Sequence, residues 1–312
     1  MKIYNNLSEY HATQKSFVTI GTFDGIHIGH QKVIKNLIES AKKENATSLL
    51  LTFFPHPRMV LQKDVDIKLI NTIGERTQLL KKMGLEALII QPFTAAFSEY
   101  SAFDFVKTVF VDKLHISKLV VGYDHQFGKN REGNLEQLNA FGEAFNYEVE
   151  KIPHQDIDNI AVSSTKIRTA IENGEIEKAN NYLGYNFMLT GEVVQGKNLG
   201  EKIGFPTANL HIKEGYKLIP KTGAYIVKAT IDNKTVFGMM NIGFRPTVSG
   251  KNQTIEIHFF DFNKNLYGKT IQVEVLYFLR NEHKFETVEF LKQQLKEDQQ
   301  KSLEIIRGTF FE

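Results

Sequence analysis

Residues 21–30, Gly-Thr-Phe-Asp-Gly-Ile-His-Ile-Gly-His, decide the fold of the first half of the chain. They separate an apolar run at Ser16–Gly21, which predicts a strand, from Gly29–Glu44, where apolar residues recur at helical spacing. Backbone amides at a strand-to-helix junction attract phosphate, and two histidines three residues apart can donate to neighbouring oxygens of one phosphate group. The stretch therefore predicts an α/β domain with a phosphate site at its first junction. The alternatives are a glycine turn with incidental histidines and a metal-binding pair.

Strands and helices continue to alternate after this junction. The predicted strands are Thr47–Phe53, Glu86–Gln91, Lys118–Gly122 and Tyr147–Ile152, and the predicted helices are Glu75–Met83, Ala102–Lys113, Leu135–Phe145, Lys166–Glu172 and Glu175–Tyr182. Repeated βαβ units imply a parallel sheet flanked by helices. Ligands of such sheets bind beyond the carboxyl ends of the strands. We assign residues 1–184 to this α/β domain.

The pattern changes after residue 184, where helical periodicity gives way to short β-type stretches punctuated by glycine. Antiparallel strands are predicted at Ala224–Ile231, Val236–Ile242, Thr254–Phe260 and Ile271–Leu279. A terminal helix follows, with Val288, Leu291 and Leu295 on one face. Residues 185–312 are therefore expected to form a small antiparallel β barrel with a terminal helix.

Composition excludes several classes of protein. The 312 residues are 42% hydrophobic and 24% charged, which is ordinary for a globular protein and argues against disorder. No cysteine is present, so disulfides, thiolate metal sites and cysteine nucleophiles are excluded, and a cytoplasmic location is expected. The net charge of +2 without a basic block argues against nucleic acid as a partner. No apolar run is long enough to cross a membrane, and oligomeric state is left open.

Three further stretches of the first half are candidate sites. Ser163-Ser164-Thr165-Lys166-Ile167-Arg168 offers helix caps and a cation near one helix end, so it predicts a second anion site; an ordinary capped helix is the alternative. Phe54-Pro55-His56-Pro57-Arg58 is a proline-stiffened loop that by itself favours a rigid turn. Gly122-Tyr123-Asp124-His125-Gln126-Phe127-Gly128 follows a strand and by itself favours a surface loop.

The second half lacks a GxxxxGK[ST] phosphate loop. Residues 191–209, GEVVQGKNLGEKIGFPTAN, are an alternative phosphate cradle, because glycine permits close backbone approach and lysine supplies charge. Thr207 and Asn209 share one face if extended, and their oxygens suit Mg²⁺. Glu256 alternates with Ile255 and Ile257 and could accept a proton from an attacking hydroxyl. A flexible hairpin and a solvent-facing glutamate are the alternatives.

Several motifs in order resemble one enzyme family. GTFDGIHIGH, FPHP, GYDHQFG and SSTKIR are similar to the adenylyltransferase half of the bacterial bifunctional riboflavin kinase/FMN adenylyltransferases, although His125 stands where phenylalanine is frequent. GEVVQGKNLGEKIGFPTANL, GMMNIGFRPT, IEIHFFDFNKNLYGK and LRNEHKF resemble the kinase half. The resemblance implies a Rossmann-like nucleotidyltransferase domain, a barrel of riboflavin-kinase type, and synthesis of FMN and then FAD from riboflavin and ATP with Mg²⁺.

The resemblance also implies roles for individual residues. Glu256, His27 and His30 are implied to be catalytic, with Glu256 activating the riboflavin 5′-hydroxyl. Residues implied to bind ATP are Gly21, Phe23, Asp24, Gly29, Ser163, Ser164, Thr165, Arg168, Gly196, Gly204 and Thr207. Residues implied to contact flavin are Phe54, Pro57, Asp124, Phe127, Arg280 and Phe285, and Thr207 and Asn209 are implied to hold the metal. For Asp24, contact with nucleotide and contact with metal both stay open.

Two other functions are consistent with part of the pattern. One is a nucleotidyltransferase for a different phosphorylated substrate, with a barrel that only binds. The other is a flavin-binding regulator that has lost catalysis. Intact His27, His30, Thr207, Asn209 and Glu256 argue against the regulator, because a sensor needs no attacking base.

Overall fold

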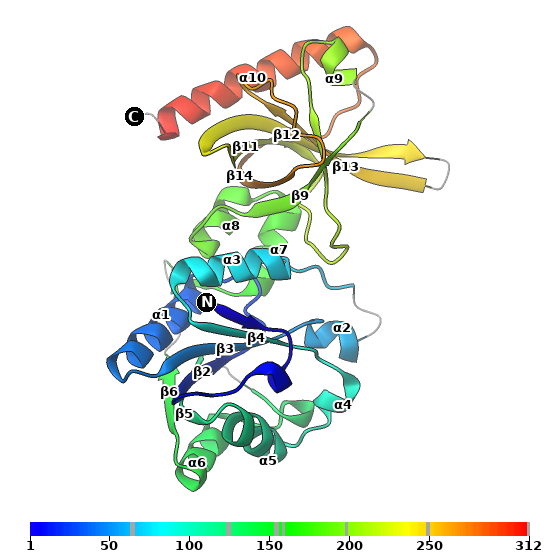
Figure 1. The fold of residues 1–312 in the computed structure, drawn as a ribbon. Helices are drawn as coiled ribbons and strands as arrows, with labels where there is room; N and C mark the ends of the chain where they lie inside the picture. The colour runs from blue at the N-terminus through cyan, green and yellow to red at the C-terminus, as the bar shows by residue number, and fades with distance from the viewer. Residues whose placement is uncertain are drawn as a thin grey trace. The chain divides into compact units, whose positions relative to one another are not determined.

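The computed structural model describes residues 1–62, 66–122, 126–152, 156–157, 160–196, 199–247 and 250–310 (Figure 1). The chain forms two compact units, Met1–Ser164 and Thr165–Glu312. The sequence placed the boundary later, after helices α7 (Ser164–Asn173) and α8 (Ile176–Leu183). The structure gives a reason for the difference: the Asn180 side chain of α8 donates to the carbonyl of Val275 in the barrel, at 2.9 Å.

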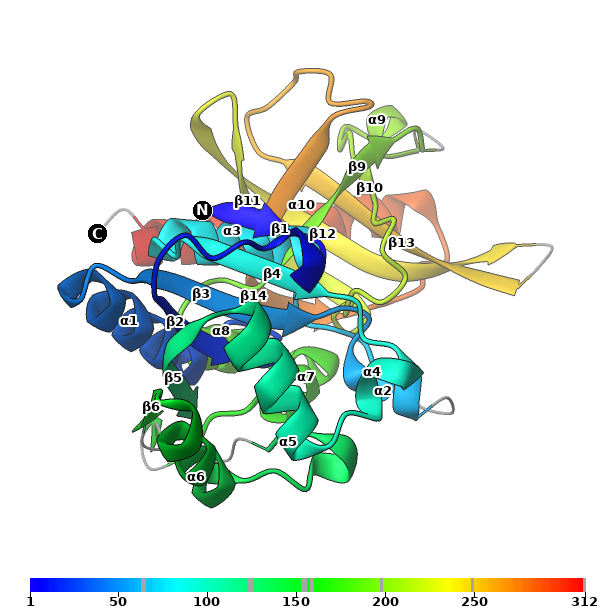
Figure 2. The same ribbon diagram turned by 60° about the horizontal axis from the view of Figure 1, so that its bottom comes forward.

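The first unit is built on a parallel sheet of six strands in the order β1-β4-β3-β2-β5-β6 (Figure 2). The strands are β1 (Lys2–Tyr4), β2 (Ser16–Ile20), β3 (Thr47–Phe53), β4 (Ala87–Gln91), β5 (Ile116–Gly122) and β6 (Glu148–Ile152). Every neighbouring pair is parallel, as predicted. Strand β1 was not predicted, because three residues are too few to show a pattern.

The strand order changes direction at β2. From β2 the chain moves through β3 to β4 on one side, and it returns to the other side of β2 with β5 and then β6. In open parallel sheets, the crevice beyond the carboxyl ends at such a switch point is where ligands bind. Residues 21–30 follow β2 directly, so the fold places them at this point.

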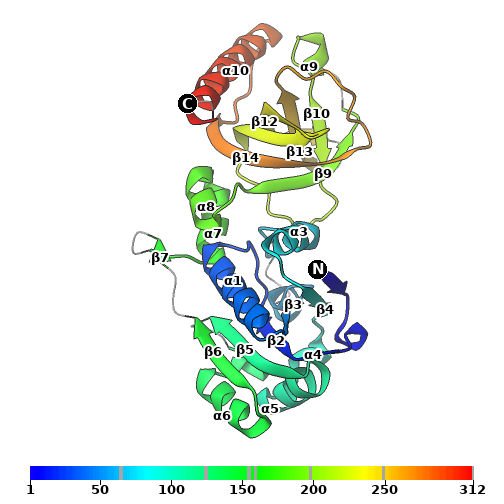
Figure 3. The ribbon, with the colours of Figure 1, turned by 60° about the vertical axis from the view of Figure 1, so that its left-hand side comes forward.

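Helices cover both faces of the sheet (Figure 3). On one face, α1 (Ile28–Lys43) and α3 (Ile73–Met83) bury a cluster that includes Phe17, Leu50 and Leu88. On the other face, α5 (Ala102–Phe105), η2 (Val106–Lys113) and α6 (Leu135–Phe145) bury a cluster that includes Val18, Leu49 and Leu51. Neighbouring strand residues thus face opposite layers, which explains why the strands read as continuous apolar runs.

The predicted helix over 102–113 is α-helical only at its start and continues as the π-helix η2. Short elements complete the two units: η1 (Leu7–Glu9), α2 (Pro57–Leu61), α4 (Ala95–Ser98), η3 (Lys129–Arg131), β7 (Asp156–Ile157), β8 (Ile160–Ala161) and α9 (Leu199–Lys202).

The second unit contains a closed antiparallel barrel in the order β10-β13-β12-β11-β14-β9, which confirms the predicted architecture. Its strands are β9 (Met188–Val194), β10 (Ala208–His211), β11 (Gly223–Ile231), β12 (Lys234–Thr247), β13 (Gly250–Phe259) and β14 (Thr270–Asn281). Closure removes the unpaired edges of the sheet. Side chains such as Tyr225, Val227 and Ile257 are fully buried.

Helix α10 (Val288–Phe310) packs along the outside of the barrel (Figure 1). Ile306 is buried against Ile226 and Met239, and Leu295 packs on the same cluster as predicted. Val288, expected on the packed face, is 46% exposed. Among the described residues, no helix is both long and apolar enough to cross a membrane.

Candidate functional site

The histidine turn, residues 21–30, connects β2 to α1 and adopts an uncommon backbone conformation. Gly25 has a φ of +87°, and the non-glycine residues Phe23 and Ile26 have φ values of +47° and +38°. A β-branched residue at positive φ is rare, because its side chain crowds the backbone. The contacts around the turn must therefore hold it in place, as is common at functional sites.

Phe23 supports His30 rather than pointing into solvent. Phe23 is buried, and its ring centroid lies 4.8 Å from that of His30. A Cβ at position 21 would lie 3.2 Å from the Phe23 ring, so Gly21 leaves room for this aromatic side chain. Gly29 lies in the first turn of α1. Direct contact of these residues with nucleotide stays a prediction.

His27 and His30 stack on each other, with ring centroids 3.6 Å apart and planes inclined by 19°. His27 is the N-cap of α1, and its Nδ1 accepts from the backbone N–H of His30 at 3.4 Å. An accepting Nδ1 carries no proton, so neutral His27 has its proton on Nε2. His30 Nδ1 is buried without a hydrogen-bond partner among the described residues, which also favours the Nε2–H tautomer. We therefore assign a donor Nε2–H to both rings.

The electrostatics of the pair keep His30 uncharged. Burial, the neighbouring His27 and the guanidinium of Arg76 together hold the pKa of His30 well below its usual value of 6.5, and burial is the largest of these causes. His30 is therefore neutral at neutral pH in the ligand-free protein. The first-turn amides of α1 add partial positive charge at the same place. The turn thus presents N–H donors beside the positive end of a helix dipole, and anion binding there stays a prediction.

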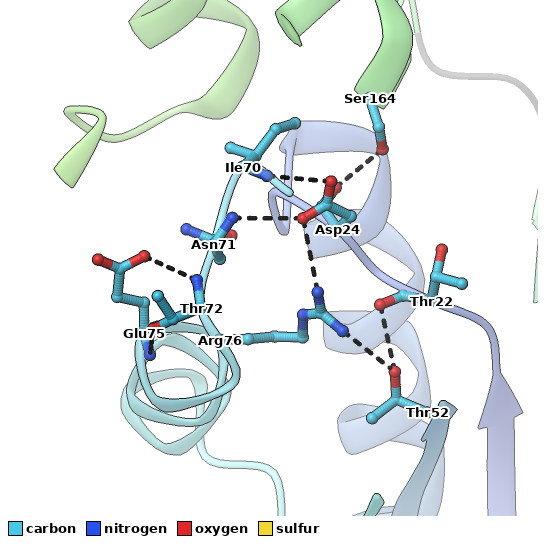
Figure 4. Close-up of polar contacts among 9 residues, drawn as sticks. All are labelled: Thr22, Asp24, Thr52, Ile70, Asn71, Thr72, Glu75, Arg76 and Ser164. Carbon is cyan, nitrogen blue, oxygen red and sulfur yellow. Dashed lines mark hydrogen bonds and ion pairs between the residues drawn. The ribbon is translucent and has the colours of Figure 1, made fainter. Parts of the chain in front are cut away.

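Asp24, which the resemblance assigns to ATP binding, is fully buried and turned toward the protein (Figure 4). Its carboxylate accepts from the backbone N–H groups of Ile70 at 3.1 Å and Asn71 at 3.3 Å. The same carboxylate pairs with Arg76 at 3.5 Å, and Arg76 is only 2% exposed. The structure thus shows Asp24 joining the histidine turn to the segment that begins α3. A contact with ligand stays a prediction.

A hydrogen bond joins the serine-threonine segment to the histidine turn. The Ser164 hydroxyl donates to the backbone carbonyl of Asp24 at 2.8 Å (Figure 4). Ser163 and Ser164 are half-buried where the first unit ends. Thr165 and Arg168 lie in the first two turns of α7, within the second unit, and their proposed nucleotide contacts stay predictions.

The proline-flanked loop forms a capped helix start. His56 is buried, and its Nδ1 accepts from the backbone N–H of Arg58 at 3.1 Å, so His56 caps α2. Pro57 occupies the first helical position, where its missing N–H costs nothing. Phe54 and Pro57 are half-buried.

Of the two flavin candidates in the following loop, Asp124 lies outside the described residues, as does His125. Phe127 is buried in the core of the first unit, with its ring centroid 6.0 Å from that of Phe105. A Cβ at position 133 would lie 2.5 Å from the Phe127 ring, so Gly133 makes room for it. The structure therefore shows Phe127 in a packing role, and its flavin contact stays a prediction.

In the barrel, two glycines of the 191–209 segment lie against the predicted metal ligands. A Cβ at position 196 would fall 2.2 Å from the Asn209 side-chain nitrogen. A Cβ at position 200 would fall 2.2 Å from the backbone oxygen of Phe205 and 3.4 Å from the Thr207 methyl carbon. Glycine is thus required for this close approach. Gly204 has a φ of +88° with open space around it, so its requirement is conformational.

The predicted ligand and the predicted base lie side by side in the barrel. Asn209 on β10 is the register partner of Glu256 on β13. Residues opposite each other on antiparallel strands have Cβ atoms about 5 Å apart on the same face. Thr207 lies two residues before Asn209, and Thr207, Asn209 and Glu256 are all half-buried. The structure thus brings together an amide and a carboxylate that are 47 positions apart in the chain.

Asn241 is a second neighbour of Glu256 in the barrel sheet, and it was not identified from the sequence. On β12, Asn241 is the register partner of Glu256 from the side opposite to Asn209, so two amides flank the carboxylate. A Cβ at position 243 would lie 3.2 Å from Asn241 Nδ2 and 2.3 Å from Glu282 Oε1. The available signal was a lone polar residue within the apolar stretch Met239–Ile242.

Arg280, assigned to flavin contact, anchors α10 to the barrel. Its Nε donates to both carboxylate oxygens of Asp298, at 2.9 and 3.0 Å, and its Nη2 donates to Asp298 Oδ2 at 2.7 Å. The Asp298 side chain is 7% exposed. The Arg280 guanidinium also lies 5.8 Å from the centroid of the Phe285 ring, which is half-buried. The ion pair therefore gives Arg280 a structural role in addition to the predicted one.

No cluster of three or more His, Asp or Glu side chains arranged to hold a metal ion occurs within the described ranges. The assignment of Thr207 and Asn209 as metal ligands stays a prediction.

Two family models cover most of the chain. The model described as FAD synthetase matches residues 9–166, and the model described as riboflavin kinase matches residues 183–306. The first match contains the histidine turn, and the second contains the whole barrel.

Curated relatives match over nearly their full length. The bifunctional riboflavin kinase/FMN adenylyltransferase of Listeria monocytogenes is 37% identical, over 91% of this chain and 90% of the relative. The Bacillus subtilis protein of the same description is 35% identical, over 93% of this chain and 92% of the relative. A crystal structure described as a macrolide-efflux protein from Streptococcus pneumoniae is 30% identical with a TM-score of 0.87, and the match covers 96% of this chain and 97% of that one. This chain therefore shares its fold with that protein. The role given in the description of that structure applies to the Streptococcus pneumoniae protein. The two models and the curated relatives show that this chain belongs to the family of bifunctional riboflavin kinase/FMN adenylyltransferases.

Proposed function

We propose that each unit carries one of the two reactions of the family, at the residues described above. The barrel phosphorylates riboflavin to FMN with the γ-phosphoryl group of ATP. The first unit then transfers the adenylyl group of a second ATP to FMN, giving FAD and pyrophosphate. The observation that carries the proposal is the row Asn209–Glu256 in the barrel together with the stacked His27 and His30 pair at the switch point of the sheet.

In adenylyl transfer, an oxygen of the FMN phosphate attacks the α-phosphorus of ATP, and the bond from that phosphorus to the bridging oxygen of pyrophosphate breaks. No proton need be removed from the attacking phosphate, so the protein positions the groups and stabilises charge. The Nε2–H groups of His27 and His30 and the start of α1 meet the negative charge that develops on the phosphates. We assign nucleotide contact to Gly21, Phe23, Asp24, Gly29, Ser163, Ser164, Thr165 and Arg168.

In the kinase reaction, the riboflavin 5′-hydroxyl oxygen attacks the γ-phosphorus, and ADP leaves. Glu256 accepts the hydroxyl proton as the new bond forms, which is the task of a base in phosphoryl transfer. Asn209 and Asn241 flank the carboxylate and restrict where it points. Gly196 and Gly204 give the ATP phosphates close access to backbone N–H groups.

Thr207 and Asn209 fit a magnesium ion, because Mg²⁺ prefers neutral or anionic oxygen ligands and keeps several of its ligands from water and phosphate. The space that a Cβ at position 196 would fill lies directly against Asn209. Bound there with ATP, Mg²⁺ would offset the negative charge of the phosphates. Both side chains are half-buried and come from one short extended segment, which supports their assignment as the protein ligands.

For the flavin ring we assign Phe54, Pro57, Asp124 and Phe127 in the first unit and Arg280 and Phe285 in the second. The half-buried Phe54 and Phe285 rings offer apolar surface to a planar ligand.

We also place the enzyme in the cytoplasm, where ATP is available and a cysteine-free chain needs no oxidising compartment.

The test is to incubate the protein with riboflavin, ATP and MgCl₂ and separate the products by chromatography. Riboflavin should disappear as FMN and then FAD accumulate, and omission of MgCl₂ should stop both steps. If the protein converts supplied FMN to FAD but does not phosphorylate riboflavin, it is a nucleotidyltransferase whose barrel only binds ligand. If it binds flavin without converting it, it is a flavin-binding regulator.

A further inference from the structure

A buried polar network ties the histidine turn to two other segments of the first unit (Figure 4). Arg76 Nη2 donates to Asp24 Oδ1 at 3.5 Å, and Arg76 Nη1 donates to Thr52 Oγ1 at 3.4 Å. The Thr52 hydroxyl in turn donates to the backbone carbonyl of Thr22 at 3.2 Å. Asp24 also accepts from the backbone N–H of Ile70. One guanidinium therefore joins α3, the carboxyl end of β3 and the turn itself.

The network is almost completely shielded from water. Asp24 is 0% exposed, Thr52 is 1% exposed and Arg76 is 2% exposed. Removing two charges from water carries a large desolvation penalty, and a well-packed apolar replacement often stabilises a protein as well or better. Stability alone is thus a weak reason for an ion pair here. Its position suggests another reason, because the three joined segments converge where the strand order reverses.

The backbone conformation of the histidine turn must be stabilised by contacts with the rest of the unit. Phe23 and Ile26, which flank Asp24 and Gly25, have positive φ values. Residues in such conformations persist only where the surroundings fix them. Thr52 fixes the carbonyl of Thr22 before the strained segment, and Arg76 fixes the carboxylate of Asp24 within it. At the end of the same segment, His27 caps the start of α1.

Arg76 also acts on the histidine pair through space. Its positive charge is one cause of the lowered pKa of His30, after burial and the neighbouring His27. Within the described part of the chain, the ionisable groups that lower the pKa of His30 are His27 in the turn and Arg76 on α3, and the Arg76 charge is itself paired with Asp24.

We propose that Arg76 is a positioning residue for adenylyl transfer, which holds the histidine turn through Asp24 and Thr52 so that the His27 and His30 donors meet the nucleotide in one fixed geometry. This inference rests on the proposed function of the turn. In this role Arg76 acts through the turn and not on the reacting atoms.

The experiment compares three network variants of the full chain with one control. Arg76→Met removes the charge and the hydrogen bonds to Asp24 and Thr52. Arg76→Lys keeps the charge with a differently shaped head group, and Thr52→Val removes only the hydroxyl. Ser48→Ala is the matched control, because Ser48 is another buried hydroxyl on β3 that bonds Glu86 instead. Ser48 lies four residues before Thr52, roughly 13 Å away along the strand.

Each variant is assayed for FAD formation from supplied FMN and for FMN formation from riboflavin. For Arg76→Met we expect kcat for FAD formation to fall about a hundredfold, as expected when reacting groups are displaced by about 1 Å. The KM for ATP should change much less, and FMN formation in the same molecule should be unaffected. Thr52→Val should reduce FAD formation about tenfold, Arg76→Lys should recover part of the loss, and Ser48→Ala should behave as the unsubstituted protein.

A histidine NMR titration supplies a readout that a general loss of stability would not move. Loss of the Arg76 charge should raise the pKa of His30 from its depressed value toward its usual one, whereas Ser48→Ala should leave the pKa where it is.

If Arg76→Met does not fold, Arg76→Lys and Thr52→Val decide the question. Equal FAD formation in Thr52→Val and Ser48→Ala, or a change in the kinase reaction as large as that in FAD formation, overturns the proposal. Failure of the proposed function is separate: it is seen when the unsubstituted protein forms no FAD, or when His30→Ala forms it normally.

Discussion

Asn209 and Glu256 are register partners on adjacent antiparallel strands, β10 and β13. This pairing places the amide oxygen of Asn209, a type of ligand that Mg²⁺ accepts, next to a carboxylate on one face of the barrel. Because both side chains project from hydrogen-bonded strands, their separation is held by the backbone rather than by a mobile loop. Such rigidity suits a site in which the phosphate and the attacking hydroxyl must be aligned together.

Glu256→Gln should suppress FMN formation by about a hundredfold or more, because glutamine keeps the shape of the side chain but cannot accept the hydroxyl proton. Adenylylation of supplied FMN should persist in the same variant, since that chemistry lies in the other unit. The measurement is chromatographic quantification of FMN and FAD from the two substrates. Asp232→Asn is the control, because Asp232 is an exposed carboxylate that follows barrel strand β11, outside the proposed cradle, and it pairs with Lys264. Normal phosphorylation of riboflavin by Glu256→Gln would show that Glu256 is not the base.

His30→Ala should lower FAD formation by about two orders of magnitude, as expected for loss of a preorganised donor to the transition state. FMN formation from riboflavin should be retained. His11→Ala, at an exposed position of the same unit, serves as the control. The two activities are measured side by side with a thermal unfolding curve. A folded variant that loses both activities equally would contradict a model with two separate sites.

The buried His30 should make the first unit less stable in acid. Its pKa in the folded protein lies well below 6.5, the value expected after unfolding. Below pH 6.5 the unfolded chain therefore binds more protons than the folded one, so the free energy of unfolding falls as the pH falls. Above about pH 7.5 both states are neutral at this position, and the contribution vanishes.

Urea unfolding of the full chain at several pH values between 5 and 8 tests this sign. His30→Gln should flatten the pH dependence of the midpoint in the transition of the first unit. A slope unchanged by the substitution would mean that His30 titrates normally in the folded protein. His11→Gln controls for loss of an exposed histidine, and the barrel provides an internal reference in the same sample.

Gly196→Ala should weaken ATP use by the kinase. The added methyl carbon would lie 2.2 Å from the Asn209 side-chain nitrogen, so Asn209 must move from the position in which it faces Glu256. We expect the KM for ATP in FMN formation to rise about tenfold or more. Steady-state kinetics at varied ATP concentration gives this value. Gly215→Ala is the matched control, because a Cβ there has no atom within 4 Å. Equal KM values for the two variants would show that the cradle tolerates a side chain.

The sequence by itself determined the two-part architecture and the position of the histidine turn between a strand and a helix. Alternating apolar runs and helical stripes are local signals, and they identified β2, β3, α1 and the parallel sheet correctly. Glycine spacing within residues 21–30 and 191–209 is equally local, because it reflects backbone conformations that few other residues adopt. The family resemblance rested on these same stretches.

Only the tertiary structure decided which distant residues lie close together at each proposed site. The burial of Arg76 is not visible in its helix, whose sequence reads as ordinary helix surface, and the pairing of Arg76 with Asp24 spans 52 positions. The flanking of Glu256 by Asn209 and Asn241 depends on strand register, which is set by the closure of the barrel. Likewise, only the structure shows that Phe127 packs in the core of the first unit and that Arg280 pairs with Asp298. The physical reason is that a sequence pattern shows which face of a helix or strand is apolar. The residues that this face contacts on other elements are decided by packing and strand register.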